Sequence, residues 1–208
     1  MTAGPLTTDL VVLVADGHAK AAIRGLMDRR ESLGIRRVGF EAYVHPHHDS
    51  GVCREAEQFL RVFLRSHRFA LAILDHHGCG YDTAPENVES DLQERLNANG
   101  WEGRSAVVVI APELEVWVWS HSPNITRPLG WSSHAELMEF LRTEQLWPEG
   151  AAKPPSPQQA LDAVLAKAKQ PRSSTLFEQL AQTVSLQHCQ DRAFLRLCDT
   201  LRAWFPAG

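Results

Sequence analysis

The chain has 208 residues, of which 44% are hydrophobic, and a formal net charge of −4. This size fits one globular domain, or one domain with a helical appendage, and the negative charge argues against a protein that coats nucleic acid by charge alone. No apolar run approaches the roughly 18 residues that a membrane helix needs, and residues 1–9 lack the pattern of a signal peptide. Four scattered cysteines without a CxxC pair favour reduced thiols and a cytoplasmic location.

Four apolar runs, at residues 10–15, 38–44, 69–74 and 106–111, predict β-strands. Three of them are almost continuously apolar, which indicates strands that are buried on both faces in a parallel sheet covered by helices. The run at 38–44 partly alternates between apolar and polar residues, so we expect it at an edge of the sheet.

Helical periodicity separates these runs and continues after the last one. The expected helices span residues 19–33, 52–67, 83–99, 133–146, 158–169, 174–184 and 190–205. Gly34 is placed to end the first helix. The segment 113–120 fits either a short helix or a strand.

This order predicts an α/β protein: a four-stranded, mainly parallel sheet flanked by helices, as in Rossmann-like folds, with a C-terminal helical extension. We expect one domain at 1–147 and the extension, packed on it, at 148–208. The proline-rich stretch 148–157 would connect the two.

Each predicted strand ends in acids or histidines, and in a parallel sheet the carboxyl ends of the strands share one edge. The residues concerned are Asp16, then His45, His47, His48 and Asp49, then Asp75, His76 and His77, and finally Glu113 and Glu115. The pattern therefore predicts one acidic, histidine-rich site. Carboxylates suit Mg²⁺ or Mn²⁺, whereas histidines suit transition metals such as Zn²⁺, which we consider the less favoured ion.

Most of these residues also have a simpler interpretation. Asp16 is equally suited to cap a helix, Glu113 and Glu115 could be surface acids, and the histidines could be solvated loop residues. Asp75 follows the most apolar strand, where an unpaired carboxylate is costly. No P-loop, dinucleotide-binding or α/β-hydrolase motif is present.

The chain resembles a known family in several places. An acid and a glycine after the first strand, with Asp75-His76-His77 after the third, resemble the Toprim fold of topoisomerases, primases and OLD-type nucleases. Residues 112–119 (PELEVWVW) are similar to the Glu-x-Trp segment of small Toprim-like proteins of bacterial defence loci. Segments of the C-terminal part are similar to a small component of methylation-associated anti-phage defence systems; they are 153–157, 173–177, 180–186, 189–195 and 204–206.

The resemblance implies a role in restricting phage DNA beside other proteins of the same system. It implies phosphodiester chemistry on a metal held by acids, with Asp16, Asp75 and Glu115 as catalytic residues. Metal ligands would be Asp16, Asp75, His77 and Glu113. The chain departs from the family because Asp16 replaces a glutamate, Lys20 stands where close relatives have an acid, and His77 replaces the second acid of an Asp-x-Asp pair.

Three functions remain open from the sequence. The first is a metal-dependent phosphodiesterase or nuclease that acts on DNA. The second is a non-catalytic subunit of a defence complex, which would dock through Trp204, Phe205 and loop tryptophans such as Trp101 and Trp147. The third is a zinc-dependent hydrolase built on the histidine loops, with His47 and His76 as ligands.

Overall fold

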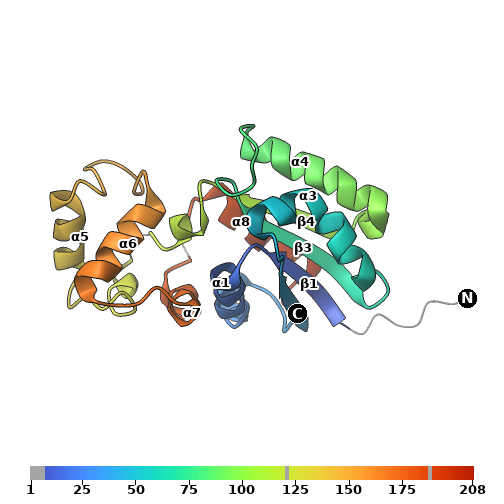
Figure 1. Ribbon diagram of the computed structural model, residues 1–208. Helices are drawn as coiled ribbons and strands as arrows, with labels where there is room; N and C mark the ends of the chain where they lie inside the picture. The colour runs from blue at the N-terminus through green and yellow to red at the C-terminus, as the bar shows by residue number, and fades with distance from the viewer. Residues whose placement is uncertain (1–7, 120–121, 187–188) are drawn as a thin grey trace, which may run out of the picture.

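The computed structural model describes residues 8–119, 122–186 and 189–208 and contains one parallel sheet (Figure 1). Its strands are β1 (Thr8–Val14), β2 (Phe40–Val44), β3 (His67–Asp75) and β4 (Ser105–Ile110), in the order β2-β1-β3-β4. All neighbouring strands are parallel. The predicted α/β fold is thereby confirmed, and β2 lies at an edge as its alternating pattern indicated.

Helices cover both faces of the sheet. In front, in the view of Figure 1, lie α3 (His48–Leu60) and α4 (Pro85–Leu96), and α8 (Arg192–Trp204) lies behind. Alternate residues of β1 point to the two layers: Val11 and Leu13 belong to the core under α3 and α4, whereas Leu10, Val12 and Val14 belong to the core under α1 (Gly17–Met27) and α8. Burial of both faces explains the continuous apolar runs.

Two predicted helices end differently in the structure. The stretch predicted as one helix at 19–33 is divided into α1 and the short α2 (Arg30–Leu33). Gly34 ends α2 in a left-handed conformation with φ 72°, so its predicted role as a helix end is confirmed. The helix predicted at 52–67 begins earlier, at His48, and ends at Leu60 with one further 3-10 turn, η1 (Arg61–Phe63). Its predicted end was wrong because His67 pairs with Thr8 at the start of β3.

The other helices lie close to their predicted positions. The N-cap of α4 is Ala84, with Pro85 in the first turn, so the helix begins two residues after its predicted start. A π turn, η2 (Asn97–Trp101), follows the helix. The segment after β4 is a 3-10 helix, η3 (Leu114–Trp117), which resolves the choice between helix and strand.

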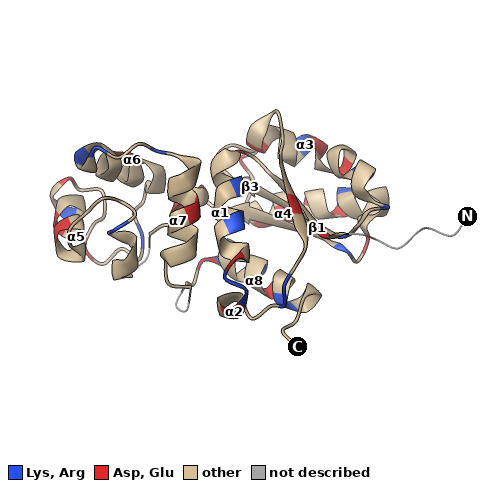
Figure 2. Ribbon diagram, turned by 90° about the horizontal axis from the view of Figure 1, so that it is seen from below, with Lys and Arg blue, Asp and Glu red and all other residues tan. Residues whose placement is uncertain are grey.

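The C-terminal helices occupy two places. One group, η4 (Pro123–Ile125), α5 (His134–Thr143) and α6 (Pro157–Ala168), forms a lobe at the left of Figure 1. By contrast, α7 (Ser174–Thr183) lies beside α1 in both Figure 1 and Figure 2. The predicted boundary at 147/148 falls between α5 and α6, which pack on each other.

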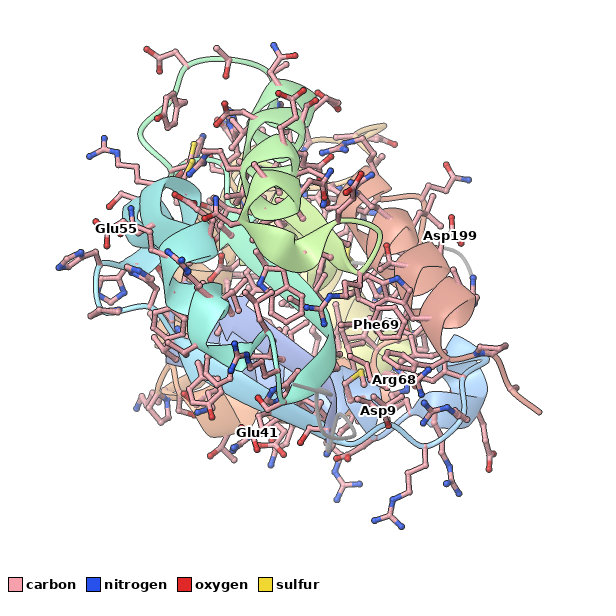
Figure 3. The ribbon with its side chains drawn as sticks, turned by 90° about the vertical axis from the view of Figure 1, so that its right-hand side faces the viewer. Asp9, Glu41, Glu55, Arg68, Phe69 and Asp199 are labelled. Atoms are coloured by element: carbon pink, nitrogen blue, oxygen red, sulfur yellow. The ribbon has the colours of Figure 1, made fainter. Side chains whose placement is uncertain are left out.

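Most aromatic residues considered for partner docking are in the core instead. Trp101, Trp147 and Phe205 are at most 2% exposed. Trp204 is partly exposed, but its ring stacks on the ring of Phe69, with centroids 4.6 Å apart. Figure 3 shows Phe69 next to α8. Trp204 and Phe205 thus fasten α8 to the sheet, and their docking role stays a prediction.

The contact between α1 and α7 requires a glycine. A Cβ at Gly25 would lie 2.5 Å from the backbone oxygen of Glu178 and 2.9 Å from Cβ of Ala181. Gly25→Ala gains about 1 kcal/mol of helix propensity but overpacks a backbone atom, which costs roughly 1–3 kcal/mol. We therefore expect a net loss of stability in urea unfolding. Adding Ala181→Gly should not restore it, since the Glu178 carbonyl remains; full rescue would contradict the steric cause.

Candidate functional site

The site begins at the end of β1, where Asp16 precedes α1. Its Oδ1 accepts a hydrogen bond from the backbone N–H of Ala19 at 2.7 Å, so Asp16 is the helix cap that one interpretation of the sequence required. Its Oδ2 lies 3.8 Å from Nδ1 of His18. The cap orients the carboxylate without removing it from the edge of the sheet.

Asp75, the last residue of β3, lies beside Asp49, which the sequence placed in the strand-end cluster but did not single out as a metal ligand. Oδ1 of Asp49, in the first turn of α3, accepts a hydrogen bond from the backbone N–H of Asp75 at 2.7 Å. The loop after β3 closes over this pair, because a Cβ at Gly78 would collide with the Asp49 carboxylate. Only glycine allows that close approach.

The acids at this edge disfavour one another's charged forms. Burial raises the pKa of Asp75 well above its usual 3.8; repulsion from Asp49 adds to this, as do Glu115 and Asp16, while the backbone N–H of Leu114 opposes it. Burial also raises the pKa of Asp49, against the hydrogen bond from Asp75 and with a contribution from Asp16. Four carboxylates thus converge where the strands end.

The fourth carboxylate, Glu115 on η3, is 3% exposed and forms an ion pair with Arg172. Arg172 also contacts Asp162 at 2.9 Å, and its guanidinium lies 5.4 Å from the ring centroid of Phe177, on which His18 stacks. Burial raises the pKa of Glu115, and Arg172 opposes that shift. A cation from the C-terminal helices therefore reaches the site.

Two further predicted ligands form a separate pair. Oε1 of Glu113 accepts a hydrogen bond from the backbone N–H of Gln158 at 2.8 Å, at the start of α6, and its Oε2 lies 3.5 Å from Nδ1 of His77. The His77 side chain is 69% exposed. Glu113 thus holds a helix terminus, and its role as a metal ligand, like that of His77, stays a prediction.

The histidine loops bring together a different group. Among the described residues, His45, His47 and Glu55 have ligand atoms within 4.8 Å of one another, which is weak support for a metal site and none for zinc in particular. Nδ1 of His45 accepts a hydrogen bond from the backbone N–H of His47, so its Nε2 carries the proton that a metal would have to replace. His76 lies outside this group and contacts the Thr83 carbonyl.

A large hollow lies away from these carboxylates. A mostly apolar cavity of about 920 Å³ separates α1, α7, η3 and α8, and its wall includes Leu26, Trp117, Phe177, Leu180 and Phe194. None of the four converging carboxylates lines it. The apolar cavity and the carboxylates thus lie at different places. We assign the candidate site to the carboxylates, because residues with shifted pKa values cluster at functional sites.

The donor set matches a hard divalent cation in chemistry, although among the described residues no three of these carboxylates have ligand atoms within 4.8 Å of one another. Four carboxylates supply oxygen, the ligand that Mg²⁺ and Mn²⁺ prefer. In Asp16 and Asp49 one oxygen is fixed by a backbone N–H, which orients the other. A bound cation would also offset the repulsion that raises the pKa of Asp75.

Two of these residues were difficult to find in the sequence. Asp49 belongs to the acid and histidine cluster after the second strand, but an acid in the first turn of a helix is commonly explained by the helix dipole. Arg172 is 57 positions from Glu115, and no local pattern links them.

Comparison with models of known protein families, with curated proteins and with solved structures returned no match for the chain. Within the described ranges, no helix is long and apolar enough to cross a membrane. The fold and the strand-end carboxylates therefore define this protein as a parallel α/β protein with an acidic site.

Proposed function

We propose that the carboxylate edge binds Mg²⁺ or Mn²⁺ and that the protein is a metal-dependent phosphodiesterase or nuclease acting on DNA. It would work in the cytoplasm with other proteins of an anti-phage defence system. The observation that carries the proposal is the convergence of Asp16, Asp49 and Asp75 beside Glu115, which Arg172 already pairs. Burial and mutual repulsion raise the pKa of Asp49 and Asp75, and a bound cation would offset that repulsion.

The residues have distinct tasks in this proposal. Asp16, Asp49 and Asp75 would hold the ion from three strand ends, and Glu115, oriented by Arg172, would complete the negative wall. The ion would supply Lewis-acid stabilisation of the phosphoryl oxygens. His18, stacked on Phe177 and 3.8 Å from Asp16, is placed to exchange a proton with a group bound at this edge.

The test measures Mn²⁺ binding by calorimetry and cleavage of supercoiled and linear DNA with Mg²⁺ or Mn²⁺. Asp49→Asn should weaken Mn²⁺ binding by at least about tenfold, since one charged oxygen ligand is lost. Asp199→Asn is the matched control, because Asp199 is an exposed acid on α8 (Figure 3) whose carboxylate lies 3.5 Å from Arg202. Equal binding by both variants, or no binding by the unaltered protein, would sink the metal site.

One contact favours a second function, a non-catalytic subunit of the defence complex. Arg172 already neutralises Glu115, as a protein cation does where no metal is needed. In that case Asp49→Asn would leave phage protection unchanged in cells that carry the whole system. Loss of protection, with the fold and the complex intact, would contradict it.

A further inference from the structure

The two edge strands of the sheet differ in whether side chains cover their outward backbone groups. At β4, side chains from α4 and α8 close the edge: Glu89 Oε1 accepts from the backbone N–H of Val109 at 2.9 Å, and Arg196 Nε donates to the carbonyl of Val107 at 2.7 Å. Arg192 reaches the Val109 carbonyl as well. No further strand can pair with β4, which is how proteins protect sheet edges.

At β2 the edge is open. Leu10 donates to the Gly39 carbonyl and His45 donates to the Val14 carbonyl, so odd-numbered residues of this segment point their backbone groups toward β1. By alternation, Phe40, Ala42 and Val44 point theirs outward. Within the described ranges, no hydrogen bond involves these outward groups.

Space for another strand lies beside this edge. A hollow of about 650 Å³ is lined by residues 40–43 of β2, by Arg24 and Asp28 of α1 and by Glu178 of α7. Figure 3 shows Glu41 at the opposite side of the sheet from Asp199 on α8. The outer edge of β2 thus borders a hollow on its α1 and α7 side.

The excess of negative charge around the hollow favours a basic strand as its occupant. On the α1 and α7 side, two carboxylates, Asp28 and Glu178, stand against one cation, Arg24. The Glu41 carboxylate adds negative charge on the other face of β2, where it contacts Tyr43 and His67. A second copy of β2 would bring the same excess of negative charge to the same place, which is repulsive. A strand with basic side chains would neutralise it.

We propose that the outer edge of β2 binds an extended, basic segment of a partner protein as a fifth strand of the sheet. Backbone hydrogen bonds to Phe40, Ala42 and Val44 would give affinity, and Asp28 and Glu178 would select Lys or Arg at the alternate positions that face α1 and α7. This surface lies on a different edge from the carboxylate site and does not depend on a metal.

The test uses an acetylated peptide of four Lys-Val repeats and its Glu-Val counterpart, with binding followed by NMR and by amide hydrogen exchange. The Lys-Val peptide should protect the amides of residues 40, 42 and 44 from exchange, and the Glu-Val peptide should not. Ala42→Pro removes one outward donor while the β1–β2 ladder persists, and should weaken binding by at least about tenfold. Ala42→Thr, which keeps the donor, is the matched control.

Three outcomes would overturn the proposal. One is equal binding of both peptides, because charge would then select nothing. Another is undiminished binding to the Ala42→Pro variant with its circular dichroism spectrum intact. The third is a dimer that Ala42→Pro converts to a monomer, since the occupant would then be a second copy of this chain.

Discussion

Replacing Asp75 with asparagine is expected to abolish Mn²⁺ binding and, at the same time, to stabilise the metal-free protein at neutral pH. The amide would retain the shape of the side chain but remove the charge that burial, Asp49, Glu115 and Asp16 all disfavour. The gain should be about 1 kcal/mol, as for other residues whose charge is needed for function. Urea unfolding at pH 7 without divalent ions measures it.

The pH dependence has a definite sign. Because the pKa of Asp75 is higher in the folded protein than its usual 3.8, the folded state holds this proton more tightly. The favourable contribution is complete below pH 3.8 and is lost as the pH rises through the folded pKa. The difference in stability between Asp75→Asn and the unaltered protein should therefore grow with rising pH. Adding Mn²⁺ should reduce it, since the ion replaces the proton.

Asp199→Asn serves again as the control, with no expected change in either measurement. If Asp75→Asn destabilised the protein at pH 7, the carboxylate would be a structural hydrogen-bond acceptor instead. If the difference in stability between Asp75→Asn and the unaltered protein did not change with pH, the raised pKa of Asp75 would be contradicted.

Glu89→Ala should cause a large loss of stability, about 2–3 kcal/mol, because it opens the edge of β4. Glu89 is 4% exposed, and its carboxylate contacts Val109, Arg192 and Arg196. The two arginine side chains are about 40% exposed and can regain water, so their lost ion pairs count for little. The unpaired Val109 N–H and the cavity left by the side chain account for most of the effect.

Glu89→Gln separates these contributions. The amide oxygen can still accept from Val109, so we expect less than half of the loss found for alanine. Chemical unfolding measures both variants. Equal losses would mean that charge, rather than the hydrogen bond to β4, stabilises this edge.

The parallel sheet was predictable because its strands are buried on both faces, and short, continuous apolar runs such as 106–111 are typical of such strands. Helix ends were less predictable: His67 fits a helical stripe, yet pairing with Thr8 places it in β3. Such long-range pairing leaves no mark in the local pattern.

The candidate site, like the fold, was only partly predictable from the sequence. Asp16 and Asp75 were identified because each directly follows an apolar strand, and the structure places both at the shared edge. Asp49 was not chosen as a metal ligand, and Arg172 was missed, because the contacts that make them important, to the Asp75 backbone and to Glu115, join separate segments. Trp101 and Trp147 looked like surface residues in loops but fill the core.

The two glutamates of η3 have a consequence for how this protein can change. Glu113 holds the start of α6, and Glu115 holds Arg172 between α6 and α7. A chain that ended before α6 would leave a buried carboxylate unpaired beside Asp75. The helical part is therefore not an exchangeable module: recombination that replaced it would have to bring an arginine to the same place, so the two parts are expected to be inherited together.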